Sequence, residues 1–276
     1  MAAPADSRPL TKEAIQSLLQ TTTFGRTLHV LQETASTNGD AMALAQQGAE
    51  DGTVVVAERQ TAGKGRLGRR WLSPPGDNLY CSVILRRMPT PAELPRWLSV
   101  VPLMAAVAVA RAVQAVTGLR PSLKWPNDIL IGDRKLGGLL CESSVAGPAR
   151  TFVVVGIGLN VNTGRESFPD EIREIATSLA AEAGRPFDRA PLLAALLSEL
   201  EAHADALLTR PPETFLSGYA RLCSTLGRRV RVRLADGETI EGQADSLAPD
   251  GSLRIIRDQA QGGGLLEVRV GDLIHL

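Results

Sequence analysis

Helical and strand periodicities divide the first third of the chain into three elements. Residues 39–47 carry Ala and Leu at helical spacing behind Ser36, Thr37 and Asn38, residue types that commonly cap helix N-termini. The β-branched run at 53–58 predicts a buried strand, and residues 79–86 predict another. A helix followed by two strands is therefore predicted for this part of the chain.

The middle of the chain alternates between longer helices and short strands. Residues 97–116 predict a long apolar helix with Pro102 in its first turn. Gly132 and Asp133 are residue types that favour a turn, and they lie between two apolar runs. Lys135 should therefore begin the return strand of a hairpin. Further elements are predicted as strands at 136–142 and 151–155 and helices at 191–208 and 212–223. Strands that meet in hairpins with helices alongside indicate an α+β fold built on a mixed sheet.

The pattern changes after Gly227. Short alternating strands are predicted at 229–234, 239–246, 252–256 and 265–270, a spacing typical of a small β-barrel. We therefore expect two domains, residues 1–225 and residues 226–276.

Composition excludes several classes of protein. The 276 residues carry 30 basic and 30 acidic side chains, so binding of a polyanion through summed positive charge is disfavoured. Three cysteines without CxxC spacing and three histidines give no zinc pattern and suggest a reducing cytosol. The N-terminus lacks an apolar signal core, and residues 100–110 are about half a membrane span, so we expect a cytoplasmic protein without a membrane segment.

A glycine-rich basic segment follows the strand at 53–58. Residues 58–71 read ERQTAGKGRLGRRW, in which Gly63, Gly65 and Gly68 alternate with cations. Such glycines let the backbone approach a ligand while the cations neutralise phosphate oxygens. The segment lacks the Walker pattern. A phosphate-binding loop is favoured, with a solvated basic loop or a nucleic-acid arm as alternatives.

Two further segments carry candidate chemistry. In KWPND, at 124–128, Pro126 fixes a turn that brings a lysine, an amide and a carboxylate together, where Asp128 could orient lysines or hold Mg²⁺; an ordinary capped turn is the structural alternative. Lys135 opens KLGGLL, whose glycines admit a flat ligand against bare backbone. Gly156 and Gly158 could line the same space.

Taken together, these segments resemble the biotin protein ligases. The resemblance covers residues 28–276 and rests on ordered motifs: STN at 36–38, ERQTAGKGRLGRRW at 58–71, NLYCSV at 78–83, KWPND at 124–128, KLGGLLCE at 135–142 and GIGLNVN at 156–162. It implies a mixed-sheet catalytic domain, of the kind found in class II aminoacyl-tRNA synthetases and biotin ligases, followed by an SH3-like barrel. Only residues 1–27 precede the first strand, so we expect no DNA-binding winged helix. Lys64 stands where the family more often has Arg. The lysine offers a point charge in place of the two-pronged guanidinium of arginine.

The resemblance also implies an activity and the residues that perform it. The expected enzyme is a biotin–[acetyl-CoA-carboxylase] ligase that activates biotin as biotinyl-5'-AMP with MgATP and transfers it to a lysine of a biotin carboxyl carrier protein. The implied catalytic residues are Lys135, Arg66 and Asp128, with Asp128 also the candidate Mg²⁺ ligand. The implied biotin contacts are Ser36, Thr37, Asn38, Gln60, Gly63, Lys64, Trp71, Tyr80, Lys135, Gly138, Leu140 and Gly156. The implied ATP contacts are Lys64, Arg66, Arg69, Trp71, Lys124, Asn127 and Asn160.

Three alternatives differ in chemistry or in class. A lipoate ligase would perform the same adenylation on another acid. A nucleic-acid-binding module would use the basic segment and the barrel. The zero net charge and the 4% aromatic content argue against such a module. A non-enzymatic biotin sink would need no triphosphate site. As partners we expect a carrier protein, no nucleic acid and no membrane, and as oligomeric state a monomer or weak homodimer.

Overall fold

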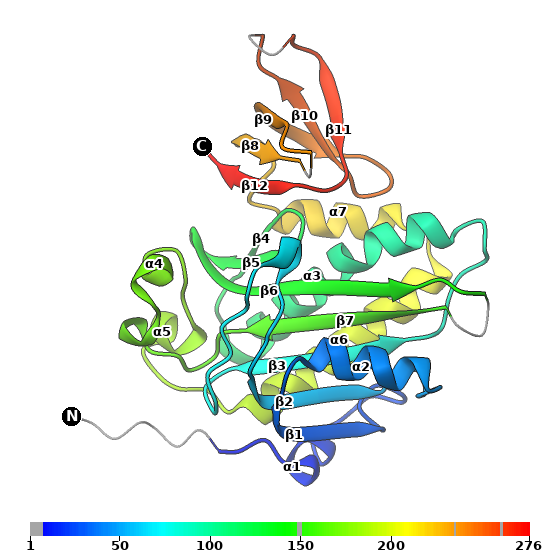
Figure 1. The fold of residues 1–276 in the computed structure, drawn as a ribbon, viewed down its shortest axis with the longest axis vertical. Helices are drawn as coiled ribbons and strands as arrows, with labels where there is room; N and C mark the ends of the chain where they lie inside the picture. Colours follow the sequence, from blue (N-terminus) through cyan, green and yellow to red (C-terminus); the bar gives the residue numbers. More distant parts are fainter. Residues whose placement is uncertain (1–7, 148–150, 235, 260–261) are drawn as a thin grey trace.

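The computed structural model describes residues 8–147, 151–234, 236–259 and 262–276. Its centre is a seven-stranded mixed sheet with the strand order β1-β2-β3-β7-β6-β5-β4 (Figure 1). Strands β1 and β2 are parallel, and the other neighbours are antiparallel. The strands are β1 (Leu28–Thr34), β2 (Val54–Gln60), β3 (Leu79–Leu85), β4 (Ser122–Lys124), β5 (Asp128–Ile131), β6 (Arg134–Ser144) and β7 (Phe152–Leu159). The predicted α+β class is confirmed.

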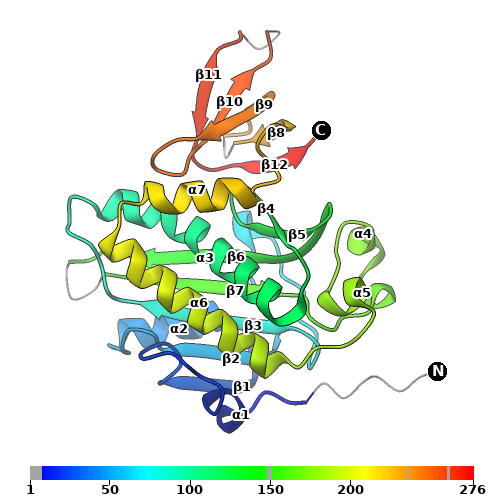
Figure 2. The same cartoon turned by 180° about the vertical axis from the view of Figure 1, so that it is seen from behind.

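Helices cover the two faces of this sheet unequally. Helix α3 (Leu94–Thr117) packs against α6 (Arg189–Thr209) on one face, where most of the apolar core lies (Figure 2). Helix α2 (Thr37–Gln46) covers only part of the opposite face, through Ala41 and Ala45. We call this second face the open face. Because α2 is short, the part of the open face beyond it is available for other groups.

Helix α3 differs from its prediction at the N-terminus. It begins three residues earlier than expected, with Pro95 in the first turn, so Pro102 lies inside the helix and not in its first turn. Among the described residues α3 is the one helix long and apolar enough to cross a membrane, which corrects the expectation that this stretch is too short. Its most apolar window is 67% buried within the fold, as expected for a core helix.

The remaining predicted helices are confirmed, and the described residues contain three short α-helices that were not predicted. The confirmed helices are α2, α6 and α7 (Glu213–Leu222). The unpredicted ones are α1 (Lys12–Gln16), α4 (Asp170–Arg173) and α5 (Leu179–Ala183), each of four or five residues. Such lengths give too few positions for a helical periodicity to stand out.

A second, antiparallel sheet follows α7 and lies beyond β4 (Figure 1). Its order is β11-β10-β9-β8-β12, built from β8 (Arg229–Arg233), β9 (Thr239–Leu247), β10 (Leu253–Arg257), β11 (Leu265–Val268) and β12 (Asp272–His275). The four predicted strands are present. The fifth, β12, was not predicted, because the expected strand at 265–270 ends before it. Five antiparallel strands are consistent with an SH3-like unit.

Candidate active site

Side-chain size falls along β7 on the open face. Residues two apart in a strand share a face, and Phe152 and Val154 pack under α2 on this one. The next two positions on the same face are Gly156 and Gly158. The missing side chains leave bare backbone just beyond α2, a glycine floor on which Asn38 packs at Gly156 and Trp71 packs at Gly158.

Neighbouring strands place charged groups on the same row as this floor. Lys124 pairs with Asp128, Asp128 with Gly138, Gly138 with Gly158 and Gly158 with Tyr80, so one row crosses β4, β5, β6, β7 and β3. Lys135 Nζ lies 2.7 Å from Asp128 Oδ1. A Cβ on Gly138 would lie 3.5 Å from the same Nζ. The hairpin lysine therefore lies over Gly138, beside Asp128.

The basic loop, residues 61–78, joins β2 to β3 and folds back on itself. Trp71 N donates to Gly63 O at 2.9 Å, and Gly65 N donates to Arg69 O at 2.7 Å. A 3₁₀ turn at Arg66–Gly68 forms the tip. Leu67 there has φ 54°, in the left-handed region that non-glycine residues seldom adopt. The loop is thus a short hairpin that presents its cations near one end.

An open cavity of about 450 Å³ lies between the basic loop and the sheet. It is lined by Lys64, Gly65, Arg66, Leu67, Gly68, Arg69, Leu140, Glu142 and Val270. Arg66 reaches over to the turn between β4 and β5, where its guanidinium donates to Asn127 Oδ1 at 2.7 Å. The Asn127 amide in turn donates to Leu139 O at 3.0 Å. Residues predicted for phosphate binding from two distant segments are therefore in contact.

Cations outnumber acids around this cavity. Burial lowers the pKa of Lys124; Asp128 and Asp272 oppose this shift, and Lys135 and Arg69 reinforce it. Burial likewise lowers the pKa of Arg66, against the effect of the same two carboxylates. Partly desolvated cations that crowd one another are stabilised by an added anion. The site is suited to an anionic ligand such as a phosphate chain.

A polar network lies at the start of α2, beside the floor. Gln60 Oε1 accepts from Thr37 N at 2.9 Å and Thr37 Oγ1 at 3.2 Å, and Gln60 Nε2 donates to Ser73 Oγ at 2.9 Å. Ser82 Oγ lies 2.9 Å from Thr37 Oγ1 and donates to Asn38 Oδ1 at 2.6 Å. Ser36 is buried at the N-cap of α2, and its side chain makes no capping bond. These groups can present donors and acceptors to a small polar head group.

Trp71 connects the basic loop to the glycine floor. A Cβ on Gly158 would lie 2.6 Å from Trp71 Nε1, so the ring lies directly against the bare strand. Lys135 Nζ lies 5.6 Å from the centroid of the same ring, within the range of a cation–π contact. A flat apolar wall thus stands beside the hairpin lysine.

Two predicted contact residues point their polar atoms elsewhere. Asn160 is buried, and its amide donates to Thr177 O at 3.0 Å. The Tyr80 hydroxyl donates to Pro74 O at 3.0 Å and accepts from Asn78 Nδ2 at 3.1 Å. In this structure both side chains are engaged by neighbouring chain segments and not by the cavity.

Sequence reasoning missed several residues of the site. Glu142 lines the cavity and accepts from Asn38 Nδ2 at 2.8 Å. Strand alternation could have identified Glu142, because Gly138, Leu140 and Glu142 are two residues apart in β6 and share a face. Asp272 forms an ion pair with Arg69, and Val270 lines the cavity. These two come from the second sheet, and no local pattern connects them to the loop.

Mg²⁺ fits this site only in company with a phosphate ligand. Within the described ranges no three His, Cys, Asp or Glu residues gather where they could hold a metal ion. Asp128 offers one carboxylate, and its Oδ1 already meets Lys135. Mg²⁺ commonly binds through one or two carboxylates together with substrate phosphates. The donor set is compatible with that arrangement.

Comparisons with known proteins agree with this geometry. The model of the biotin/lipoate A/B protein ligase family matches residues 30–161. The biotin–[acetyl-CoA-carboxylase] ligase of Mycobacterium tuberculosis is 37% identical over 255 residues, covering 91% of this chain and 90% of that protein. The bifunctional ligase/repressor BirA of Bacillus subtilis is 35% identical and covers 88% and 74%. The structure of the Aquifex aeolicus biotin protein ligase in complex with biotin and ATP has a TM-score of 0.76 at 30% identity, covering 91% of this chain and all of that one.

Proposed function

Because the chain belongs to the biotin protein ligase family, we propose that it activates biotin with ATP and transfers the biotinyl group to a carrier-protein lysine. The observation that carries this proposal is the cavity itself. Lys64, Arg66 and Arg69 line it with one acid, Glu142. Arg66 also reaches Asn127, the neighbour of Asp128 in the Lys135–Asp128 pair. A carboxylate and a triphosphate repel each other, so aligning them and neutralising their charge is the main task.

The first half-reaction joins the two substrates. A biotin carboxylate oxygen attacks the α-phosphorus of ATP, the bond from that phosphorus to the bridging oxygen breaks, and pyrophosphate leaves. We assign Lys135 to the carboxylate and the α-phosphate. Arg66, Arg69, Lys64 and Lys124 surround the phosphate chain. The ligand can displace the Arg69–Asp272 contact because both side chains are partly exposed.

The second half-reaction transfers the acyl group. The amine nitrogen of a carrier lysine attacks the biotinyl carbonyl carbon, AMP leaves with the electrons of the broken bond, and the amine gives up a proton. Lys135 stabilises the charge that develops on the departing phosphate. Asp128 keeps Lys135 in place through the 2.7 Å ion pair.

The biotin contacts follow from the polar network and the floor. We assign the ureido group to Ser36, Thr37, Asn38 and Gln60, whose polar atoms gather at the start of α2. The apolar rings and chain of biotin lie against Trp71, Leu140, Gly138 and Gly156. Gly63 and Lys64 close the pocket from the loop side. Tyr80 contributes its ring, and Asn127 and Asn160 lie toward the adenylate side.

Mg²⁺ is proposed to enter with ATP. Asp128 is the carboxylate that could ligate it, and the ion would offset phosphate charge. If Asp128 only orients Lys135, then Asp128→Asn lowers the rate without changing the Mg²⁺ concentration needed for half-maximal activity. If Asp128 is a ligand, that concentration rises. A Mg²⁺ titration of pyrophosphate release separates the two roles.

Carrier modification is the direct test of the function. The protein is incubated with biotin, MgATP and an apo carrier domain, and the carrier's intact mass is measured. We expect one biotinyl group on one lysine. Lipoate in place of biotin is the matched comparison, and preferential lipoyl transfer would contradict the proposal. Tight biotin binding without pyrophosphate release would instead indicate a biotin sink.

We propose no nucleic-acid or membrane partner and a cytoplasmic location, in line with the zero net charge and the burial of α3. A monomer or weak homodimer is the proposed oligomeric state. Sedimentation with and without biotin and ATP tests the oligomeric state. Gel shifts at varied salt test the nucleic-acid alternative.

A further inference from the structure

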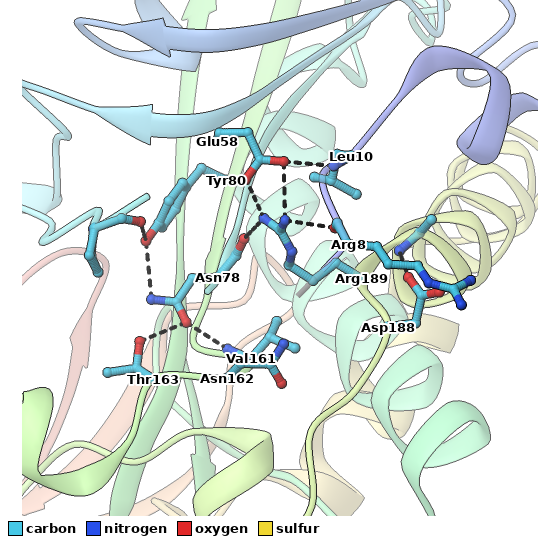
Figure 3. A network of polar contacts seen from close by, with 12 residues as sticks. Arg8, Leu10, Glu58, Asn78, Tyr80, Val161, Asn162, Thr163, Asp188 and Arg189 are labelled. Carbon is cyan, nitrogen blue, oxygen red and sulfur yellow. Dashed lines mark hydrogen bonds and ion pairs between the residues drawn. The ribbon is translucent and has the colours of Figure 1, made fainter. Parts of the chain in front are cut away.

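A buried arginine lies beneath the base of the basic loop. Arg189, the first residue of α6, is 1% exposed. Its guanidinium contacts both carboxylate oxygens of Glu58, at 2.7 and 3.1 Å (Figure 3). The same group donates to Asn78 O and to Arg8 O, each at 3.1 Å. Four of its hydrogen-bond contacts therefore reach three separate chain segments.

Two of these segments meet at the base of the basic loop, one on β2 just before the loop and the other at the loop's last residue. Strands β2 and β3 pair as far as Ala57 and Tyr80. Glu58 comes directly after that pair on β2, and Asn78 is the last residue of the loop before β3. One nitrogen, Nη1 of Arg189, donates to both the Glu58 carboxylate and the Asn78 carbonyl. The arginine thus bridges the loop where its two ends separate.

Asn78 and Tyr80 extend this connection into the loop and behind it. Asn78 Oδ1 accepts from Val161 N and Thr163 Oγ1, each at 2.9 Å (Figure 3). Its amide nitrogen donates to the Tyr80 hydroxyl, which donates to Pro74 O. The returning arm of the loop is therefore tied to the segment after β7.

The bridge requires the shape of a guanidinium as well as its charge. A buried ion pair often contributes little net stability, because desolvating two charges is costly. Nη1 contacts Glu58 Oε2 and Asn78 O while Nη2 contacts Glu58 Oε1 and Arg8 O, whereas a lysine ammonium presents one nitrogen at a single point. Replacing Arg by Lys therefore keeps a charge opposite Glu58 and weakens the second contact.

We propose that Arg189 is a positioning residue for the basic loop: by bridging Glu58 and Asn78 it fixes where Lys64, Arg66 and Arg69 meet the nucleotide. This inference rests on the proposed function of the loop. Arg189 lies on α6, which packs on the opposite face of the sheet, so it acts through the loop and not by contact with substrate.

Arg189→Lys and Tyr80→Phe test the bridge from its two sides. The basic loop carries four trypsin sites, at Lys64, Arg66, Arg69 and Arg70. We expect both ligand-free variants to be cut in the loop several-fold faster than wild type, about tenfold for Arg189→Lys, because local opening becomes easier. We also expect the KM for ATP in pyrophosphate release to rise about tenfold, since a displaced cation aligns the phosphate poorly.

Glu201→Gln is the matched control. Glu201 is also a buried carboxylate, but it accepts from the backbone of Thr22, Thr23 and Phe24, away from the loop. A variant that only lowers the folded fraction reduces kcat and leaves KM unchanged. The proposal is overturned if Arg189→Lys leaves loop cleavage and the KM for ATP at wild-type values, or changes them no more than Glu201→Gln does.

The cleavage assay separates this inference from the proposed function. It uses ligand-free protein and scores only cuts between residues 61 and 78. If wild-type protein released no pyrophosphate with biotin and ATP, the proposed function would fail. Faster loop cleavage in Arg189→Lys would then still support the bridge, and equal cleavage would reject it.

Discussion

Among single residues, Lys135 carries the strongest expectation. Its ammonium lies 2.7 Å from Asp128 Oδ1 and over Gly138. Removing one preorganised contact to developing charge typically costs 10²–10³ in rate. Lys135→Ala should therefore slow biotinyl-AMP formation by about that factor, measured as pyrophosphate release.

Lys12→Ala is the matched control, because Lys12 is an exposed lysine in α1. It should leave the rate unchanged. If Lys135→Ala also turned over within about twofold of wild type, Lys135 would have no part in the chemistry, whatever its position.

Residue chemistry was predictable where it depended on local pattern. The lysines and glycines of KWPND and KLGG were identified from the sequence. The strand register places Lys124, Asp128 and Gly138 in one row, and the Lys135 ammonium meets that row at Asp128. The acidic residues Glu142 and Asp272 were not identified. Glu142 lies two residues beyond Leu140, the last residue of the KLGGLL motif, on the same face of β6. Asp272 is 203 positions from its partner Arg69. A contact set by tertiary packing leaves no periodicity in the sequence.

At the level of elements, the shape of β7 determines where Trp71 can lie. A Cβ on Gly158 would stand 2.6 Å from the Trp71 ring, so Gly158→Ala must displace the indole from its place beside Lys135. Misplacement of a binding group by about 1 Å can cost about 10² in rate. We expect kcat/KM for biotin to fall by at least tenfold in steady-state kinetics.

Gly164→Ala provides the comparison for that substitution. A Cβ there would be 3.8 Å from its nearest neighbour, and the backbone is extended with φ −66°. It should bind biotin like wild type. Equal kinetics for Gly158→Ala and Gly164→Ala would mean that Trp71 is not part of the biotin wall.

The sequence predicted the major elements because their periodicities were long or strongly apolar. The start of α3 was misplaced because Pro102, a residue that usually marks a first turn, lies inside a helix whose N-terminus is set by Pro95. Strand β12 was missed, because the strand predicted at 265–270 ends before it and its four residues are too few for a clear alternation. The order of strands in the large sheet depends on packing between distant segments, which local patterns do not encode.

In the whole molecule, the second sheet meets the catalytic site. We propose that residues 226–276 form a separate domain that completes one wall of the cavity. Trp125 Nε1 donates to Gly251 O at 3.0 Å, and Val270 lines the cavity beside the basic loop. Asp272 lies against Arg69, one of the assigned phosphate contacts.

Asp272→Asn tests this wall. The Arg69–Asp272 pair is exposed enough to contribute only about 0–1 kcal/mol to stability. Removing the carboxylate also removes an anion that competes with phosphate. We expect the KM for ATP to fall by about three- to fivefold, equivalent to about 1 kcal/mol, with little change in unfolding temperature.

Asp258→Asn is the control for that measurement. Asp258 pairs with Arg229 on the same sheet at nearly the same exposure, 30% against 31% for Asp272, and neither Asp258 nor Arg229 lines the cavity. If the two variants gave the same KM for ATP, the second sheet would not influence the nucleotide site.

The junction between the two sheets should make stability depend on pH. Burial lowers the pKa of His275 to about 4, helped by the positive charges of Lys124 and Arg228 and opposed by Asp133. The ring lies 3.0 Å from Thr225 Oγ1 and 3.3 Å from the Arg228 guanidinium. An ordinary histidine in the unfolded chain titrates near 6.5.

Between pH 6.5 and about pH 4, His275 is therefore protonated in the unfolded chain and neutral in the folded protein. Because the unfolded state binds the extra proton, the free energy of unfolding decreases as the pH falls through this range. Solvent screens a half-buried ring, which limits the effect to about 1–2 kcal/mol. His275→Gln removes the titrating group. Urea unfolding at pH 7 and pH 4.5 should show a smaller loss of stability for the variant than for wild type. Equal losses would mean that His275 is protonated alike in the folded and unfolded states.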